Sequence, residues 1–406
     1  MISVEEALER ILGAIHPLLP TQVPLAEAAG LILATDVVAH EDMPPFANSA
    51  MDGFALRSQE SLPRQGQPAR LRITGSVAAG YVAEHAVEEG TAMRIMTGAP
   101  IPAGADTVIQ SELTASDGPQ SAWVDILQPV TAGNNIRPAG EDMRRGQTIL
   151  RAGSEIGPWE TGILATLGLA QVPVIRRPRV AIVGTGDEVV EIDQTPGPGQ
   201  IRNSNSYLLA AAAARAGAQP VRLGVARDTA QSLREHLGRA HDSDLVITSG
   251  GVSVGDFDLV KDILAEQGEI HFWRINMRPG KPVAFGHIGQ TPLLGLPGNP
   301  VSAAVTFELF ARPVLRKMLG HTRLQRPQVE VTVEDGVAEK AMRRHYVRAH
   351  VRWHEGRFLA HTTGNQGSNI LTSLINANAL IVVPEGGVVI PPGATARALM
   401  LDWPEI

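Results

Sequence analysis

Residues 245–260, LVITSGGVSVGDFDLV, contain the pattern that decides the fold. An apolar run typical of a buried strand ends at Ser249 and a glycine pair, and two acids, Asp256 and Asp258, follow at the start of a predicted helix. Glycines at a strand end let another group approach the backbone closely, and acids beside them indicate a bound cation. The stretch therefore predicts a ligand site at the end of a strand.

The surrounding region, 174–322, alternates strand-like and helix-like runs. In chain order these runs are RVAIVGTGDEV, NSNSYLLAAAAARAG, PVRLGVARD, TAQSLREHLGRA, DLVITSGG, DFDLVKDILAEQG and TPLLGLPGNPVSAAVTFELFARPVL. Strands that alternate with helices of this length predict a doubly wound, mostly parallel sheet with helices on its faces.

The flanking regions have a different character. Ser3 and Glu6 form a capping box before an amphipathic helix, and a second helix, near Pro158, is expected to pack against it. Short β-like runs with Gly/Pro turns lie between these helices and again after about residue 323. The predicted chain is multidomain α/β plus β: an N-terminal helical/linker domain (1–40 and 144–173), an inserted β domain (41–143), an α/β domain (174–322) and a C-terminal β-barrel-like domain (323–406).

The composition excludes several classes of protein. The 406 residues include no cysteine, so thiolate chemistry, disulfides and cysteine-bound zinc are excluded. A formal net charge of −7 without a basic cluster argues against nucleic-acid binding. Neither a signal peptide nor an apolar stretch long enough for a membrane helix is apparent. The expected setting is the cytoplasm.

Acids recur at the predicted strand ends of the α/β domain. Asp187 and Glu188 follow the first strand, Asp228 the second, and Asp256 and Asp258 the third. The carboxyl ends of parallel strands share one edge, where ligands bind. The alternative is that Asp228 and Asp258 merely cap helices. Several loops with Gly or acid on one edge favour a metal and phosphate site.

The loops also indicate which ligand binds. A P-loop is absent, and GTGDEV lacks the third small residue of a dinucleotide fingerprint. Instead, LPGNPVSA places Gly298 and Asn299 before a helix, where backbone N–H groups attract an anion. Carboxylates near a phosphate require a divalent cation, for which Mg²⁺ is suited, and MRPGKP adds Arg278 and Lys281.

Three motifs in this order, TSGGVSVGDFD, MRPGKP and LPGNPVS, resemble the molybdopterin-binding domain shared by MoeA-type molybdenumtransferases and smaller pterin adenylyltransferases. PPFANSAMDGFAL (44–56), RIMTGAPIPAGADTVI (94–109) and RPAGEDMRRGQTIL (137–150) resemble the N-terminal part of MoeA and of the gephyrin E domain. HYVRAHV and TGNQGSN resemble its C-terminal β domain. Because the adenylyltransferases have only the α/β unit, the resemblance points to the MoeA family.

The resemblance implies the insertion of molybdate into adenylylated molybdopterin, with Mg²⁺-dependent cleavage of its pyrophosphate bond and release of AMP. It implies a homodimer whose active site lies between subunits. The expected partners are a molybdopterin adenylyltransferase upstream and cofactor-maturation proteins or molybdoenzymes downstream. Whether molybdate or tungstate is the physiological anion stays open.

The matching positions give a set of site residues. The catalytic ones are Asp52, Thr97, Asp142, Glu188, Asp228 and Asp256, of which Asp228 and Asp256 are expected to bind the metal. The substrate-binding ones are Ser249, Gly250, Gly251, Pro297, Gly298, Asn299, Arg278, Lys281, Arg348 and Ser368. Arg278 stands where the family's loop has a lysine, which preserves the charge but changes the reach.

Two alternatives stay open at this point. One is a molybdopterin adenylyltransferase acting on free molybdopterin and ATP, against which the additional domains argue. The other is a non-enzymatic scaffold, since the gephyrin E domain also serves as an assembly platform. A scaffold would have no need of the acids, so an enzyme is favoured.

Overall fold

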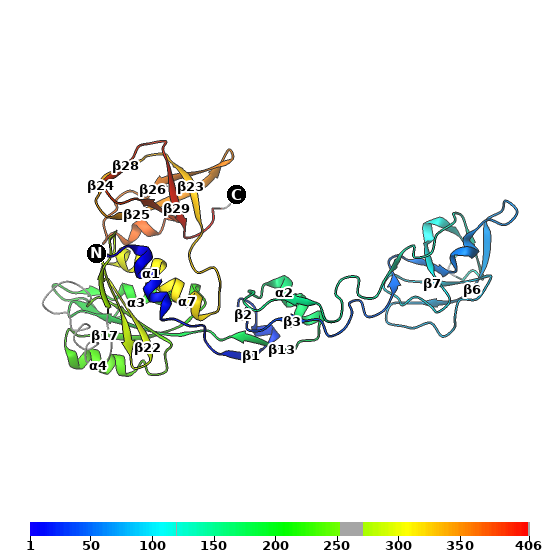
Figure 1. Ribbon diagram of the computed structural model, residues 1–406, viewed down its shortest axis with the longest axis horizontal. Coiled ribbons are helices and arrows are strands. Elements are labelled where there is room, and N and C mark those ends of the chain that lie inside the picture. Colours follow the sequence, from blue (N-terminus) through cyan, green and yellow to red (C-terminus); the bar gives the residue numbers. More distant parts are fainter. Residues whose placement is uncertain (119, 252–270, 405–406) are drawn as a thin grey trace. The chain divides into compact units, whose positions relative to one another are not determined.

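The computed structural model describes residues 1–118, 120–251 and 271–404. Asp256 and Asp258 lie outside these residues. The chain forms two compact units, whose elements are labelled in Figure 1. The first unit comprises Met1–Thr35, Gly153–Thr161 and Ala170–Ile406, and the second comprises Asp36–Ala152 and Gly162–Leu169.

The α/β part of the first unit is built on a sheet with the strand order β17-β14-β18-β22-β21-β19. Its strands are β14 (Arg179–Thr185), β17 (Gln219–Ala226), β18 (Leu245–Ser249), β19 (His271–Arg274), β21 (Pro282–Ile288) and β22 (Thr291–Leu296). The pairings from β17 to β22 are parallel, so the carboxyl ends of these strands share one edge.

The predicted parallel arrangement holds for three of the five described pairings of this sheet, and the other two are antiparallel. β21 pairs antiparallel with both β22 and β19. A tight turn at Gly289, whose φ is 58°, joins β21 to β22. A glycine turn between two apolar runs is a hairpin signal, which a pattern of alternating strands and helices does not include.

Helices cover both faces of the sheet, as predicted for a doubly wound fold. They are α3 (Ser204–Arg215), α4 (Ala230–Gly238), and a continuous run of α6 (Pro300–Thr306), the π-helical turn η4 (Phe307–Ala311) and α7 (Arg312–Met318). Val180 and Ile182 of β14 pack in one core with α3, α6 and α7. Ala181 and Val183 pack in another with α4. Successive side chains of β14 thus point to opposite faces of the sheet, and both faces are buried.

The N-terminal helix α1 (Val4–Gly13) packs on the α/β domain. Ser3 caps it as predicted, because its Oγ accepts a hydrogen bond of 3.0 Å from the Glu6 N–H. The buried face of α1 shares a core with Phe307 and Phe310, and α1 lies beside α7 (Figure 1). The predicted packing against the helix near Pro158 is therefore wrong. The apolar stripe of α1 is buried by residues some 300 positions later, which local patterning cannot reveal.

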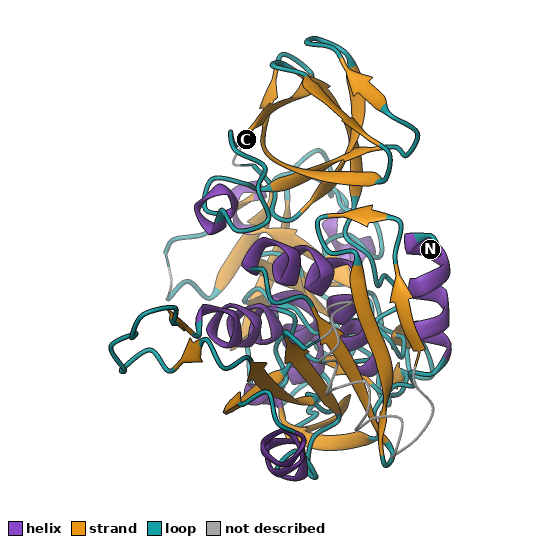
Figure 2. Cartoon of the chain, turned by 90° about the vertical axis from the view of Figure 1, so that its left-hand side faces the viewer, coloured by secondary structure: helices purple, strands orange, loops and turns teal. Residues whose placement is uncertain are grey.

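The C-terminal part of the first unit is a closed barrel, visible as a ring in Figure 2. Each wall strand pairs with the next in the order β25-β26-β23-β29-β27, and β27 pairs back to β25. The strands are β23 (Gln328–Val333), β25 (Arg344–His354), β26 (Arg357–Thr362), β27 (Ala379–Val383) and β29 (Thr395–Met400). The turn η5 (Leu371–Leu374) and the pair β24 (Val337–Ala341) and β28 (Val388–Ile390) accompany it.

A short strand joins the barrel to the α/β domain. β20 (Met277–Arg278) pairs parallel with β25, which places Met277 opposite Arg344 and Arg278 opposite His345. Elsewhere in this unit, β13 (Gln171–Ile175) pairs with β1 (Pro20–Pro24) and β2 (Ile32–Leu33). The unit also contains the turn η1 (Leu25–Glu27) and the parallel pair β15 (Val189–Val190) and β16 (Ile201–Arg202).

The second unit contains a sheet with the order β8-β5-β7-β6-β10-β9. Its strands are β5 (Gly53–Leu56), β6 (Ala69–Val77), β7 (Thr91–Ile95), β8 (Thr107–Gln110), β9 (Thr114–Ala115) and β10 (Trp123–Ile126). Phe54 and Ile109 lie in one core, and Ala55 and Val108 in another, so both faces are buried.

Shorter elements are β3 (Val37–Val38), β4 (Asn48–Ser49), β11 (Ile136–Arg137), β12 (Thr148–Leu150), η2 (Ser58–Ser61) and η3 (Ser111–Leu113). The helix α2 (Pro158–Thr166) spans the boundary between the units.

Candidate functional site

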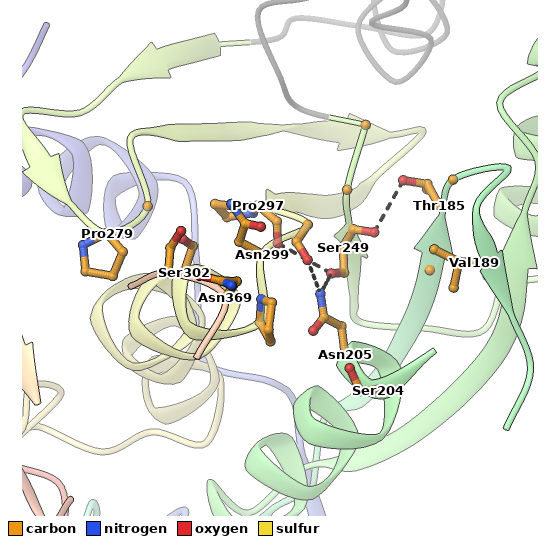
Figure 3. A pocket seen from close by; sticks show the side chains of 18 of the residues that line it. Thr185, Val189, Ser204, Asn205, Ser249, Pro279, Pro297, Asn299, Ser302 and Asn369 are labelled. Atoms are coloured by element: carbon orange, nitrogen blue, oxygen red, sulfur yellow. Dashed lines mark hydrogen bonds between the residues drawn. The ribbon is translucent and has the colours of Figure 1, made fainter. Parts of the chain in front are cut away.

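A cavity of about 980 Å³ opens at the carboxyl edge of the α/β sheet. Its walls come from the loops after β14, β17, β18 and β22, from the segment between β20 and β21, and from barrel residues 366–369 (Figure 3). The predicted site residues that line it are Glu188, Asp228, Ser249, Gly250, Gly251, Arg278, Lys281, Pro297, Gly298, Asn299 and Ser368. The structure thus brings together in one cavity residues from loops far apart in the chain.

Two glycines shape these walls. Gly250 has a φ of 97°, and a Cβ there would lie 2.6 Å from Thr185 Oγ1. Gly280 has a φ of 96°, and a Cβ there would collide with Thr306 Cγ2. Both positions require glycine because of backbone conformation and close packing. The group that approaches Gly250 most closely is therefore part of the protein itself.

Two acids lie at one end of the cavity. Glu188 and Asp228 are exposed and line it, and Figure 3 places Val189 at that end. The helix-capping alternative for Asp228 is wrong, because Thr229 is the N-cap of α4 and its Oγ1 accepts a 3.2 Å bond from the Ser232 N–H. The carboxylate of Asp228 is thus left for another function.

The neighbouring acid Asp187 has a structural function. Its Oδ1 accepts a 3.2 Å hydrogen bond from the Asp228 N–H, and its carbonyl accepts one of 3.3 Å from Arg227. Asp187 therefore ties the loop after β14 to the loop after β17. This contact holds the backbone of Asp228 at the cavity edge.

Cations gather at the other end of the cavity. Arg278 precedes Pro279, which Figure 3 places opposite Val189, and Lys281 follows two residues after it. Arg343, which was not predicted, also lines the cavity, and its Nη1 donates a 3.3 Å bond to the Met277 carbonyl. The β20–β25 pairing explains this gathering, because it brings Arg278 beside the start of β25. The two acids, with Arg202 near them, thus lie toward Val189, and three cations lie toward Pro279.

Arg348 lies behind the cationic end rather than on its surface. The side chain is fully buried; its Nε donates to Ser373 Oγ at 3.0 Å and its Nη2 to the Gly367 carbonyl at 3.1 Å. Its Nη1 has no hydrogen-bond partner among the described residues. Burial, with a smaller contribution from the charge of Arg278, lowers the pKa of Arg348 to about 10, so the group stays charged at neutral pH. Arg348 supports the loop that carries Ser368.

The remaining predicted residues lie in the second unit. Asp52 Oδ1 accepts two hydrogen bonds of 2.7 Å, from the N–H and the hydroxyl of Thr97. These bonds lower the pKa of Asp52, first the backbone one and then the side-chain one. Asp142 is exposed, and its N–H donates to the Met43 carbonyl at 3.0 Å. Asp52 is thus an exposed, ionised carboxylate held by Thr97.

The described residues provide only some of the ligands that a metal site requires. They include no group of three or more His, Cys, Asp or Glu side chains that could hold an ion. Glu188 and Asp228 nevertheless offer carboxylate oxygens to the same cavity. Mg²⁺ commonly takes one or two carboxylates and completes its shell with waters and substrate phosphates, so this donor set fits it.

Sequence reasoning missed Asn205. Its Nδ2 donates to Ser249 Oγ at 2.8 Å and to the Gly298 carbonyl at 2.7 Å (Figure 3). The available signal was its place in the first turn of a helix that follows a carboxyl-edge loop. The N-cap of this helix is Asn203, whose Oδ1 accepts a hydrogen bond from the Ser206 N–H.

Comparisons with known proteins find relatives for nearly the whole length of the chain. The family descriptions "MoeA N-terminal region (domain I and II)", "Probable molybdopterin binding domain" and "MoeA C-terminal region (domain IV)" match residues 2–168, 181–317 and 330–401. A molybdopterin molybdenumtransferase 2 of Mycobacterium tuberculosis is 38% identical over 97% of this chain and 98% of its own. The chain belongs to the MoeA family. This confirms the resemblance found in the sequence.

Other MoeA proteins agree over the full length. A molybdopterin molybdenumtransferase of a Nostoc species is 39% identical over 93% of this chain and 88% of its own. A solved structure of a molybdopterin biosynthesis MoeA protein from Pyrococcus horikoshii OT3 has a TM-score of 0.83 at 30% identity, covering 98% of this chain and 100% of that one. Within residues 1–118, 120–251 and 271–404, every helix falls short of the length and apolar character that a membrane span requires.

Proposed function

We propose that this MoeA-family chain is a molybdopterin molybdenumtransferase of molybdenum cofactor biosynthesis. Its substrates are adenylylated molybdopterin and molybdate, and it cleaves the pyrophosphate bond with release of AMP. The cavity with acids at one end and cations at the other supports this proposal, in a chain that matches named molybdenumtransferases over almost its full length. We retain the prediction that the protein is cytoplasmic.

The acidic end is assigned to the pyrophosphate chemistry. Asp228 and Asp256 would hold Mg²⁺, Asp256 being outside the described residues, with Glu188 beside them. Bound Mg²⁺ would neutralise charge on the phosphate oxygens, which otherwise repel the carboxylates. The loops bearing Ser249, Gly250, Gly251, Pro297, Gly298 and Asn299 would hold the phosphate-bearing part of the substrate.

The cationic end is assigned to the oxyanion. Molybdate is a tetrahedral dianion, which guanidinium, ammonium and hydroxyl donors bind well. Arg278, Lys281 and Ser368 line this end. Arg348 stands behind Ser368, and its Nη1, which has no partner among the described residues, is a buried donor suited to an anion. Arg343 adds positive charge to the same end.

The second unit is assigned to a site shared between two subunits. Asp52, Thr97 and Asp142 of one copy of the chain would complete the cavity of a second copy in a homodimer. The hydrogen bonds from Thr97 keep the Asp52 carboxylate ionised and oriented, as a general base or a metal-assisting group must be.

The direct test is to incubate the protein with adenylylated molybdopterin, molybdate and Mg²⁺ and to measure AMP. Release of AMP that depends on molybdate and Mg²⁺ is expected. Release of pyrophosphate from ATP and free molybdopterin would instead identify an adenylyltransferase. Absence of both reactions, in protein shown to be folded, would favour a scaffold.

One prediction concerns the oxyanion. Arg348→Ala is expected to raise the molybdate concentration needed for half-maximal insertion, with little change in the binding of adenylylated molybdopterin. Removing this charge and its support of the loop that carries Ser368 is expected to cost about as much as one charge-assisted hydrogen bond, roughly 1.5–3 kcal/mol, or about ten- to a hundredfold in anion affinity. Molybdate is titrated at a fixed pterin concentration.

Arg352→Ala is the matched control for this titration. Arg352 lies on the same strand but is exposed and paired with Glu334 at 2.6 Å. Because Arg348 also supports the loop near Gly367, thermal unfolding of both variants is compared. An unchanged half-saturation point in the Arg348 variant would place the anion elsewhere.

A further inference from the structure

We infer that Asn205 is a positioning residue for the phosphate-bearing part of the substrate, an inference that rests on the proposed function. Asn205 lies in the first turn of α3, so its side chain extends from the helix start toward the carboxyl edge of the sheet. There it touches two cavity loops at once, the one after β18 and the one after β22. These loops come from neighbouring parallel strands, in which Ser249 lies opposite Leu296.

The amide of Asn205 uses both of its donor hydrogens to join these loops. One goes to Ser249 Oγ at 2.8 Å and the other to the Gly298 carbonyl at 2.7 Å. Ser249 Oγ in turn lies 3.5 Å from the Pro297 carbonyl, and the Ser249 carbonyl accepts a 3.3 Å bond from Thr185 Oγ1. The Asn205 side chain thus joins two of the cavity loops, and Ser249 links them to the end of β14 through Thr185.

The contacts decide which way the amide faces. Gly298 offers a carbonyl oxygen, which can only accept, so the nitrogen of Asn205 must face it. Asn205 Oδ1 is then buried without a partner among the described residues. A buried acceptor without a donor costs free energy. The two hydrogen bonds that the amide nitrogen donates outweigh this cost, and the orientation is therefore retained.

No other residue type reproduces this arrangement. A serine hydroxyl has a single donor hydrogen and cannot serve both loops. An ionised aspartate has none, and its oxygens would repel the Gly298 carbonyl. A helix residue with two donor hydrogens on a short, neutral side chain must be asparagine. The spacing of the two loops therefore depends on the amide of Asn205.

The test compares Asn205→Ala and Asn205→Asp with the unchanged protein. Binding of Mg²⁺-pyrophosphate is measured by calorimetry, and AMP release by steady-state kinetics. Both variants are expected to bind pyrophosphate about tenfold or more weakly and to raise KM for adenylylated molybdopterin. The half-saturating molybdate concentration is expected to stay unchanged, because the two hydrogen bonds of Asn205 go to Ser249 and Gly298 in the loops after β18 and β22.

The pH dependence separates positioning from general damage. At about pH 8 the introduced carboxylate repels Gly298, so Asn205→Asp binds pyrophosphate more weakly than Asn205→Ala. A neighbouring hydrogen-bond acceptor favours the protonated form of a carboxyl. As the pH falls, the carboxyl is protonated and donates one hydrogen bond, so the Asp variant regains affinity relative to the Ala variant. Equal profiles for the two variants would overturn the inference.

Asn376→Asp is the control for the charge change. Asn376 is exposed and lies outside this cavity, so its variant should keep wild-type affinity and the same unfolding temperature. If the unchanged protein releases no AMP, the proposed function fails, while the pyrophosphate comparison still tests Asn205. If it releases AMP and the Asn205 variants match it in affinity and KM, the inference about Asn205 fails alone.

Discussion

Asp228→Asn is expected to slow AMP release by about a hundredfold or more, because it removes a negative charge from the proposed magnesium site. That factor corresponds to a loss of about 3 kcal/mol of transition-state stabilisation. The fold should be unaffected. Asp228 is exposed, and Thr229 rather than Asp228 caps α4. An amide still offers one oxygen, so excess Mg²⁺ should partly restore the rate.

Steady-state AMP release is measured at several Mg²⁺ concentrations, beside thermal unfolding. Asp193→Asn is the matched control, since Asp193 is also an exposed acid of the α/β domain but does not line the cavity. Asp256→Asn is expected to behave like Asp228→Asn. Turnover at the wild-type rate in the Asp228 variant would remove this residue from the metal site.

Mixing two inactive variants is expected to restore activity. Asp52→Ala and Asp228→Ala damage different parts of the proposed site, which would come from different subunits. After complete exchange half of the dimers are mixed, and one of their two sites is undamaged. About a quarter of the wild-type activity should therefore return.

Subunit exchange is verified with differently tagged chains, and each variant mixed with unlabelled copies of itself is the control. Folding of the second unit should persist in Asp52→Ala, because Asp52 is fully exposed and its bonds to Thr97 lie at the surface. Verified exchange without any recovery would place the whole site within one chain and would contradict the shared-site assignment.

The sequence predicted those features of the fold and the site that depend on patterns of neighbouring residues. Alternating strands and helices predicted the doubly wound core, and acids after successive strands predicted the edge at which Glu188 and Asp228 line one cavity. The short motifs identified the family. These features depend on neighbouring residues, so a single sequence is enough to read them.

Contacts over long distances in the chain were not readable. Arg348 sits in an ordinary strand pattern, and only the fold reveals that its side chain is buried behind Ser368. Asn205 reads as an unremarkable residue of a capped helix until the loops after β18 and β22 meet it. Asp52 alone reads as a turn residue, and its pairing with Thr97 spans 45 positions.

The packing of α1 has a consequence for synthesis on the ribosome. Lys317 Nζ donates a 2.7 Å bond to the Leu12 carbonyl across 305 positions, and α1 shares its core with Phe307 and Phe310. Translation adds about 5–20 residues per second, so the apolar side of α1 stays unburied for about 15–60 s before the residues that cover it are synthesised. The second unit is complete after residue 169 and can fold during that interval. A nascent chain arrested before residue 300 should therefore expose α1 to chaperones while the second unit already resists protease.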